Sequence, residues 1–289
     1  IAMLIPPSAL AVMLGSLAGI SIERLLIGGI LPGMLMAAGF LAYVVVRSRL
    51  RPQDAPMSDD DPATRLKGWA LWKPFVFNVV PLLGIFIAVV GSMLAGWASP
   101  TESAAIGVVA SVLATIAYRA LTLKALWKSL IETAKVSVVI LFILAASTTF
   151  AQLLSFSGAS AGFLGMIKDY DLSPFVLVIC MLLVLLVMGM VLDQISMMMI
   201  ALPFFMPLAL AAGVDTVWLG VMILIALEIG LLTPPFGLLL IVMQSVAPPS
   251  IRLPHIYSAA VPFLVIEIGI LALVLFVPWV AVGLPGLIG

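Results

Sequence analysis

Long apolar runs cover most of the 289-residue chain, separated by short polar or proline-containing breaks. A membrane-spanning helix needs about 20 mainly apolar residues. Runs of this kind predict helices over 1–20, 26–46, 75–97, 101–118, 136–156, 175–192, 193–212, 216–247 and 258–283. Composition agrees, because 64% of the residues are hydrophobic and only 9% are charged, whereas about a quarter are charged in a soluble domain. We therefore predict an all-α polytopic membrane protein.

Basic residues gather in two places, and these predict the topology. The first is the polar stretch 47–73, which also carries acids and prolines and is predicted to be a cytoplasmic loop; the second runs from Arg119 to Lys135. The positive-inside rule places both in the cytoplasm. The intervening 74–118 then crosses twice, with its outer turn near Ser99-Pro100. A formal net charge of zero argues against a nucleic-acid partner.

Two later segments do not fit simple crossings. The segment 175–212 lies between loops that the same topology places outside, and Asp193 is at its middle. This predicts a re-entrant hairpin with an acid at its tip. The segment 216–247 is interrupted by Thr233-Pro234-Pro235, and proline cannot continue a helix normally. We expect two half-helices joined by unwound backbone, which a membrane tolerates only inside protein or beside a water-filled cavity.

Two stretches carry the same features in the same order. Ile5-Pro6-Pro7-Ser8 precedes Pro32, and Thr233-Pro234-Pro235-Phe236 precedes Pro262; each later proline is expected to open an apolar helix. The predicted topology gives the two copies opposite directions. Inverted repeats with paired broken helices are typical of secondary transporters, whose site lies at the repeat interface. Because a hairpin precedes only the second copy, we expect a matching hairpin upstream of the first.

The breaks and the intramembrane acids are the candidate chemical groups. Unwound carbonyls and a carboxylate can replace the water shell of Na⁺, and half-helix N-termini favour anions. Asp193 is either an ion ligand or the N-cap of the following helix, and one residue can do both. Glu228 either serves a cavity or is a structural partner. Ser99-Pro100-Thr101-Glu102 has the form of a capping box.

The motifs in the sequence do not support an enzyme. The sequence contains no G-x-S-x-G, H-E-x-x-H, Walker lysine or G-x-G-x-x-G pattern. An intramembrane aspartyl protease needs two facing acids, and Asp193 has only the distant Glu228. We therefore expect a protein that is not an enzyme.

Four motifs, in order, resemble one transporter family. The chain resembles the large membrane subunit of tripartite ATP-independent periplasmic (TRAP) transporters over its whole length. The motifs are Ile5-Pro6-Pro7-Ser8, Ala98-Ser99-Pro100-Thr101-Glu102-Ser103-Ala104-Ala105, Gly189-Met190-Val191-Leu192-Asp193 with Ala201-Leu202-Pro203-Phe204-Phe205-Met206-Pro207, and Glu228-Ile229-Gly230-Leu231-Leu232-Thr233-Pro234-Pro235-Phe236-Gly237.

The resemblance implies an inverted-repeat elevator-type fold with Na⁺ as the coupling ion and no other cofactor. Its transport domain would comprise 1–20 and 175–247, with scaffold or arm helices over 21–174 and a C-terminal arm helix in 248–289. It also implies uptake of small organic anions, such as C4-dicarboxylates or sialic acid, through the bacterial inner membrane. A periplasmic binding protein would deliver the substrate, and a small membrane subunit would brace the scaffold.

Site residues follow from the same resemblance. A first Na⁺ site, of which only part is present, would include Ala2, Ile5, Pro6 and Pro7. A second would combine Asp193 with Gly230, Thr233 and Pro235. Candidates for the substrate cavity are Ser8, Gln194, Ser196 and Glu228.

Three alternatives stay open from the sequence. A related Na⁺/anion symporter of similar fold would work without a binding protein, and a channel would show downhill flux independent of sodium. A purely structural membrane partner would tolerate Asp193→Ala.

Overall fold

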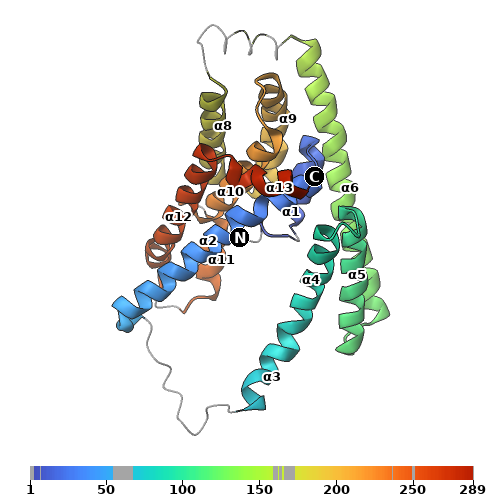
Figure 1. Cartoon of the computed structure of the whole chain (residues 1–289), viewed down its shortest axis with the longest axis vertical. Helices are drawn as coiled ribbons and strands as arrows, with labels where there is room; N and C mark the ends of the chain where they lie inside the picture. The colour runs from blue at the N-terminus through green and yellow to red at the C-terminus, as the bar shows by residue number, and fades with distance from the viewer. Residues whose placement is uncertain are drawn as a thin grey trace. The chain divides into compact units, whose positions relative to one another are not determined.

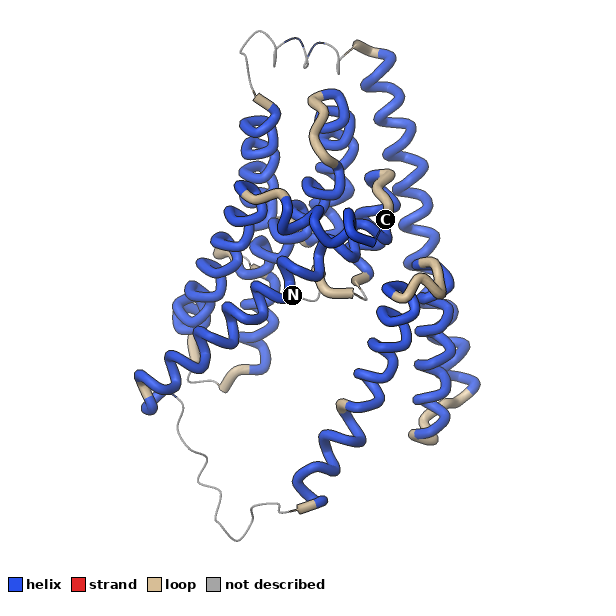
Figure 2. Tube along the Cα trace, viewed as in Figure 1, coloured by secondary structure: helices blue, strands red, loops and turns tan. Residues whose placement is uncertain are grey.

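The computed structural model describes residues 3–6, 8–54, 68–158, 162, 165, 173–235, 237–248 and 251–288. Regular structure in these ranges is helical, and no strand is drawn among them (Figure 2). The helices are α1 (Ala9–Ala18), α2 (Ile22–Leu50), the 3₁₀ turn η1 (Pro52–Asp54), α3 (Trp69–Asn78), α4 (Val80–Leu94), α5 (Pro100–Ala117), α6 (Leu123–Phe156), α8 (Pro174–Gly189), α9 (Gln194–Ala211), α10 (Thr216–Leu232), α11 (Leu238–Val246), α12 (Leu253–Phe276) and α13 (Trp279–Ile288) (Figure 1).

Several of these helices can cross a bilayer. Length and apolar composition qualify five of the described stretches, namely α2, Trp69–Met93, α5, α9 and α12. The chain is therefore an all-α polytopic membrane protein, as predicted. It divides into two compact units, one of residues 1–40 with 136–289 and the other of 41–135.

Helix α10 forms the core of the first unit. Every residue from Leu219 to Leu227 is buried. The helices α1, α8, α9, α11, α12 and α13 all pack against it. A helix that is apolar on every side is stable only when other elements or lipid surround it, and here six helices do so. The Trp218 indole also donates a 2.7 Å hydrogen bond to the Val274 carbonyl of α12.

Short polar side chains cap the N-termini of helices in this unit. Ser173 accepts from the backbone N–H of Val176 at the start of α8, and Asp215 accepts from Trp218 N–H at the start of α10. Such caps satisfy N–H groups that a helix cannot satisfy internally. At the other end of α1, Gly19 has φ +66°, which closes the helix in the left-handed conformation.

Both predicted repeat copies have the same layout. Each is a short helix after a proline-containing turn, α1 or α11, followed by a long helix, α2 or α12. The expectation that Pro32 and Pro262 open helices was wrong, because both lie inside them. Ser21 and Arg252 precede these helices instead, and neighbouring groups in a packed bundle can compensate the hydrogen bond that an interior proline lacks.

The C-terminal apolar stretch is two helices rather than one. α12 ends at Phe276 and α13 begins at Trp279, with Pro278 between them. Proline cannot donate to the preceding turn, which accounts for the break. The sequence missed this because the apolar character continues through it.

The second unit contains an antiparallel pair, α4 and α5, that meets near Ser99 as predicted. The capping box is present, because Ser99 N–H donates to the Glu102 carboxylate at 2.7 Å and the Glu102 N–H donates to Ser99 Oγ at 3.4 Å. Ser92 and Ser103 share a 3.1 Å hydrogen bond between the two helices. Elsewhere their apolar side chains are largely exposed, as lipid-facing residues are.

Glycines on α2 admit backbone from two other segments. A Cβ on Gly28 would lie 2.7 Å from the Ala281 carbonyl oxygen of α13, and a Cβ on Gly29 would overlap the Leu4 carbonyl. A Cβ on Gly33, one turn further along α2, would lie 2.7 Å from the Ile5 side chain. Gly29 and Gly33 have the small-xxx-small spacing that lets segments approach closely in membranes. This spacing holds the turn at 3–6 against α2.

We predict that Gly29→Ala destabilises the protein, whereas Gly269→Ala does not. The added methyl at position 29 meets the Leu4 backbone, while nothing lies within 4 Å of Gly269. Overpacking costs about 1–3 kcal/mol, and alanine otherwise favours a helix by about 1 kcal/mol. Thermal unfolding of the full-length protein in detergent measures both. Equal melting temperatures for the two variants would contradict the close contact.

Candidate functional site

The hairpin formed by α8 and α9 has a four-residue tip. α8 ends at Gly189, and Leu192 N–H donates to the Met188 carbonyl at 2.9 Å, which turns the chain. Asp193 follows and precedes α9. The predicted hairpin with an acid at its tip is therefore confirmed as a pair of helices; its entry into the membrane from one side stays a prediction.

Asp193 is the N-cap of α9. Its Oδ2 accepts from the backbone N–H of Ile195 at 3.1 Å and of Ser196 at 3.2 Å, and its Oδ1 accepts from the Ser196 hydroxyl at 2.5 Å. The sequence left two roles open, and the capping role is present. A carboxylate has about four acceptor positions, so three bonds leave capacity for one further donor or cation. Asp193 is half-buried.

The second element of the site is the break that separates α10 from α11. Thr233 is extended, with φ −86° and ψ 121°, and its hydroxyl donates to the Ile229 carbonyl at 2.7 Å. The hydroxyl oxygen keeps lone pairs as an acceptor. Gly237 accepts from Leu240 N–H at 2.7 Å and starts α11. The Tyr257 hydroxyl of α12 donates to the Pro235 carbonyl at 2.5 Å and ties down the break.

Two glycines bring the end of α8, directly before the hairpin tip, against the last turn of α10, directly before the break. A Cβ on Gly189 would lie 2.7 Å from the Gly230 Cα, and a Cβ on Gly230 would lie 2.9 Å from the Gly189 Cα. Both residues are buried. Any side chain at either position would therefore push the two backbones apart. This pair lets the end of α8, directly before the tip, touch the last turn of α10.

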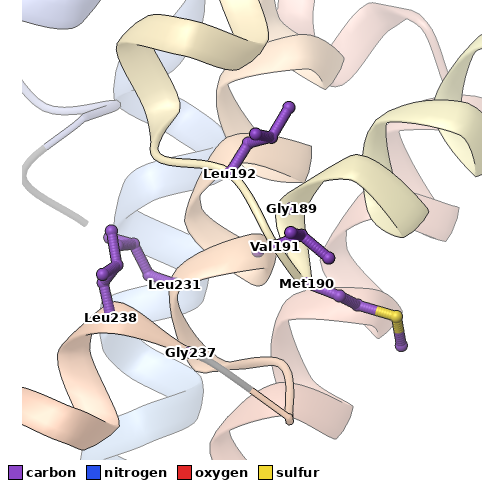
Figure 3. Close-up of a pocket in the computed structure, with 8 residues that line it drawn as sticks. Gly189, Met190, Val191, Leu192, Leu231, Gly237 and Leu238 are labelled. Atoms are coloured by element: carbon purple, nitrogen blue, oxygen red, sulfur yellow. The ribbon is translucent and has the colours of Figure 1, made fainter.

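A small cavity lies at this junction (Figure 3). Its interior has a volume of about 10 Å³ and is lined by Gly189, Met190, Val191, Leu192, Gly230, Leu231, Gly237 and Leu238. Figure 3 shows the tip passing beside the turn that carries Gly237, with the Met190 side chain directed away from Leu231 and Leu238. A cavity needs about 10–15 Å³ of interior volume to hold one water molecule, so this cavity is close to the size of a single water molecule or ion and is too small for an organic anion.

The predicted second-site residues are only partly united here. Gly230 lines the cavity, and Asp193 directly follows its lining residue Leu192. Thr233 and Pro235 belong to the adjoining break but are not lining residues. The hairpin tip and the break after α10 therefore lie next to each other.

The first-repeat residues lie at a different place, against α2. Ser8 is buried, donates to the Met3 carbonyl at 2.6 Å and caps α1 through the Ala11 N–H. Ile5 packs against Gly33, and Pro6 is buried. Ala2 and Pro7, the other predicted residues of the first Na⁺ site, lie outside the described residues.

The remaining cavity candidates have mixed positions. Ser196 donates its hydroxyl to Asp193 and so supports that carboxylate. Gln194 is the first residue of α9 and Glu228 lies in α10; both are half-buried, and neither lines the cavity. Glu267 of α12 is a further acid, 1% exposed, whose Oε2 has no hydrogen-bond partner among the described residues.

Sequence reasoning missed the function of Gly189 as the partner of Gly230. The residue was visible as part of a motif, but periodicity carries no information about which backbones meet. It also missed Tyr257, whose position one turn into α12 gave no polar signal beyond the hydroxyl itself.

Comparison with known proteins agrees with this architecture. A family model described as "Tripartite ATP-independent periplasmic transporter, DctM component" matches residues 1–280. The "C4-dicarboxylate TRAP transporter large permease protein DctM" of Pseudomonas aeruginosa is 30% identical over 99% of this chain and 65% of its own length. The "2,3-diketo-L-gulonate TRAP transporter large permease protein YiaN" of Escherichia coli is 31% identical over 96% and 63%.

A third relative carries a different substrate name. The "Sialic acid TRAP transporter permease protein SiaT" of Haemophilus influenzae is 27% identical over 99% of this chain and 45% of its own length. The chain thus spans two thirds or less of these three relatives. The family model covers nearly the whole chain, in which paired proline breaks flank an acid-tipped hairpin. By this match, the chain belongs to the family of TRAP transporter large permease (DctM) components.

Proposed function

We propose that this chain is part of a sodium-coupled secondary transporter that moves small organic anions across the bacterial inner membrane. The observation that carries the proposal is the contact of the Asp193 hairpin tip with the break after α10, at a cavity of ionic size. Membership of the TRAP family supports the transport class. The names of relatives favour C4-dicarboxylates, a sugar acid such as diketogulonate, or sialic acid as the substrate class.

In this proposal Na⁺ binds between tip and break. Backbone carbonyls between Gly230 and Pro235, each with a second lone pair beyond any hydrogen bond it accepts, are the kind of ligand that replaces the water shell of Na⁺. The Thr233 hydroxyl oxygen and the open position on the Asp193 carboxylate are further ligands of this kind. A second Na⁺ site would form around the first-repeat turn that includes Ile5 and Pro6. The substrate would lie near the N-termini of half-helices, where Ser8, Gln194 and Ser196 are candidate contacts. Glu228, toward the C-terminal end of α10, is a further candidate.

The proposed mechanism is an elevator. Residues 1–20 and 175–247 would move together as a transport domain against the helices of 21–174. A periplasmic binding protein would deliver the anion, and a small membrane subunit would support the fixed part. Membership of the TRAP family, in which a relative is named as a sialic acid TRAP transporter permease, supports these partners.

The decisive test is uptake by the full-length permease in proteoliposomes. The permease is reconstituted with its small subunit and binding protein, and labelled organic acids are supplied with and without a Na⁺ gradient. We expect uptake of one acid that requires both the gradient and the binding protein. Uptake indifferent to Na⁺ would reject sodium coupling, and Na⁺-driven uptake without the binding protein would favour a simpler symporter.

Asp193→Asn separates the two functions of this residue. Asparagine caps a helix about as well as aspartate, so the fold and melting temperature should be kept, while the negative charge is lost. We predict that the half-saturating Na⁺ concentration for uptake rises about tenfold, which corresponds to about 1.4 kcal/mol of binding free energy. Asp193→Ala should show this loss and a lower melting temperature.

An unchanged Na⁺ dependence in Asp193→Asn would mean that Asp193 is only a cap. The matched control is Asp215→Asn, since Asp215 caps α10 by a hydrogen bond to Trp218 N–H at 2.8 Å. It removes one acid from another cap without touching the proposed ion site.

We further predict that Gly230→Ala impairs uptake. The new methyl would meet the Gly189 backbone at 2.9 Å, and overpacking of about 1–3 kcal/mol would separate tip from break. A loss of about 1.4 kcal/mol in the free energy of Na⁺ binding weakens that binding tenfold. We therefore expect uptake at limiting Na⁺ to fall about tenfold. Gly269→Ala, with open space around it, is the control, and wild-type uptake by Gly230→Ala would contradict a functional contact.

A further inference from the structure

The end of α2 carries a second concave surface, unrelated to the hairpin and the breaks. It has a volume of about 220 Å³ and is lined by Tyr43, Val46, Arg47, Leu50 and Arg51. These positions are spaced i, i+3, i+4, i+7 and i+8, so they form one face of the helix. We call this face the α2 basic groove. Arg49, in the same turn, lies on another side of the helix and does not line it.

The surface of the groove is almost wholly carbon, although two of its five lining residues are arginines. Val46 is 53% exposed and Leu50 is 77% exposed, which is unfavourable in water for two aliphatic side chains on one face. Arg47 donates a 2.6 Å hydrogen bond to the Tyr43 hydroxyl, and its guanidinium lies 5.9 Å from the centre of that ring. The tyrosine thus fixes one arginine beside the apolar stripe, and Arg51 follows one turn later.

The length of α2 places this groove at the membrane surface. With 29 residues and a rise of about 1.5 Å per residue, α2 is about 43 Å long, whereas the hydrocarbon core is about 30 Å thick. The last turns therefore extend into the headgroup layer. A tyrosine and arginines at the end of an apolar span are typical of that layer, and the positive-inside rule assigns this end to the cytoplasmic leaflet, where anionic lipids reside.

We propose that the α2 basic groove binds an anionic phospholipid, with the phosphate between Arg47 and Arg51 and an acyl chain along Val46 and Leu50. Arginine matches phosphate oxygens with paired N–H donors, and the neighbouring aliphatic side chains explain why a lipid, rather than a soluble phosphate, is the occupant. The site depends on membrane location alone and not on sodium coupling. A failure here therefore leaves the proposed transport function untouched.

A plainer explanation is that the arginines only complement the negative end of the α2 dipole. That explanation treats Arg47, Arg49 and Arg51 alike, because the first two lie in the last turn of the helix and Arg51 directly follows it. The groove distinguishes them, since only Arg47 and Arg51 line it. Arg49 is therefore a matched control of equal charge on the same helix end.

The test uses the full-length permease with its small subunit, purified in a neutral detergent. Phosphatidylglycerol or phosphatidylcholine is titrated in, and bound lipid is counted by native mass spectrometry. Arg51→Gln and Arg47→Gln should each weaken phosphatidylglycerol binding about fivefold, since one basic residue near anionic lipid contributes about 1 kcal/mol, while Arg49→Gln should change it less than twofold. Leu50→Gln should weaken binding of the lipid but not of glycerophosphoglycerol, which lacks acyl chains.

Equal losses for Arg49→Gln and Arg51→Gln would overturn the proposal in favour of general surface charge. Equal binding of phosphatidylglycerol and phosphatidylcholine by the wild type would also overturn it. Binding of glycerophosphoglycerol as tight as that of the lipid would replace the membrane lipid by a soluble phosphate. All four substitutions are at exposed positions, and an unchanged melting temperature for each verifies that the fold is intact.

Discussion

Backbone groups that are not in a helix must find partners within the protein, because the apolar membrane interior supplies none. This requirement governs both breaks of the chain. After α10, the Thr233 hydroxyl, the Tyr257 hydroxyl and the Gly237 carbonyl all engage in hydrogen bonds at or beside the break. Before α1, Ser8 bonds to both the Met3 carbonyl and the Ala11 N–H. The broken regions can exist at membrane depth because polar side chains and close packing surround them.

Close packing in turn depends on residues without side chains. Gly29 and Gly33 admit the first-repeat turn to α2, and Gly189 and Gly230 join the hairpin tip to α10. Helix α10 holds these parts together, since it is buried along nearly its whole length and contacts six neighbours. An ion site built on such a frame has its backbone ligands held in place before the ion arrives, which lowers the ordering cost of binding.

Several of these features could be predicted from the sequence, because they depend on residues that are neighbours along the chain. Double proline located the break after α10, and S-x-x-E located the start of α5, because both act through the backbone of their immediate neighbours. The hairpin followed from an acid in the middle of a long apolar run. Pro32 and Pro262 were misplaced because a proline inside a packed bundle costs less than it does in water, and the division between α12 and α13 was hidden in unbroken apolar sequence. The contact of Gly189 with Gly230 joins residues 41 positions apart, and no periodicity reports such a pairing.

A substitution at Gly189 or Gly230 cannot be compensated by a second substitution at the other position. In most packed pairs, growth of one side chain can be offset by shrinkage of its partner, so the two positions change together over time. Here neither partner has anything left to remove, because glycine is already the smallest residue. A substitution at either position can be relieved only by moving a helix, and the same backbone approach that builds the cavity thereby makes these two positions resistant to compensated change.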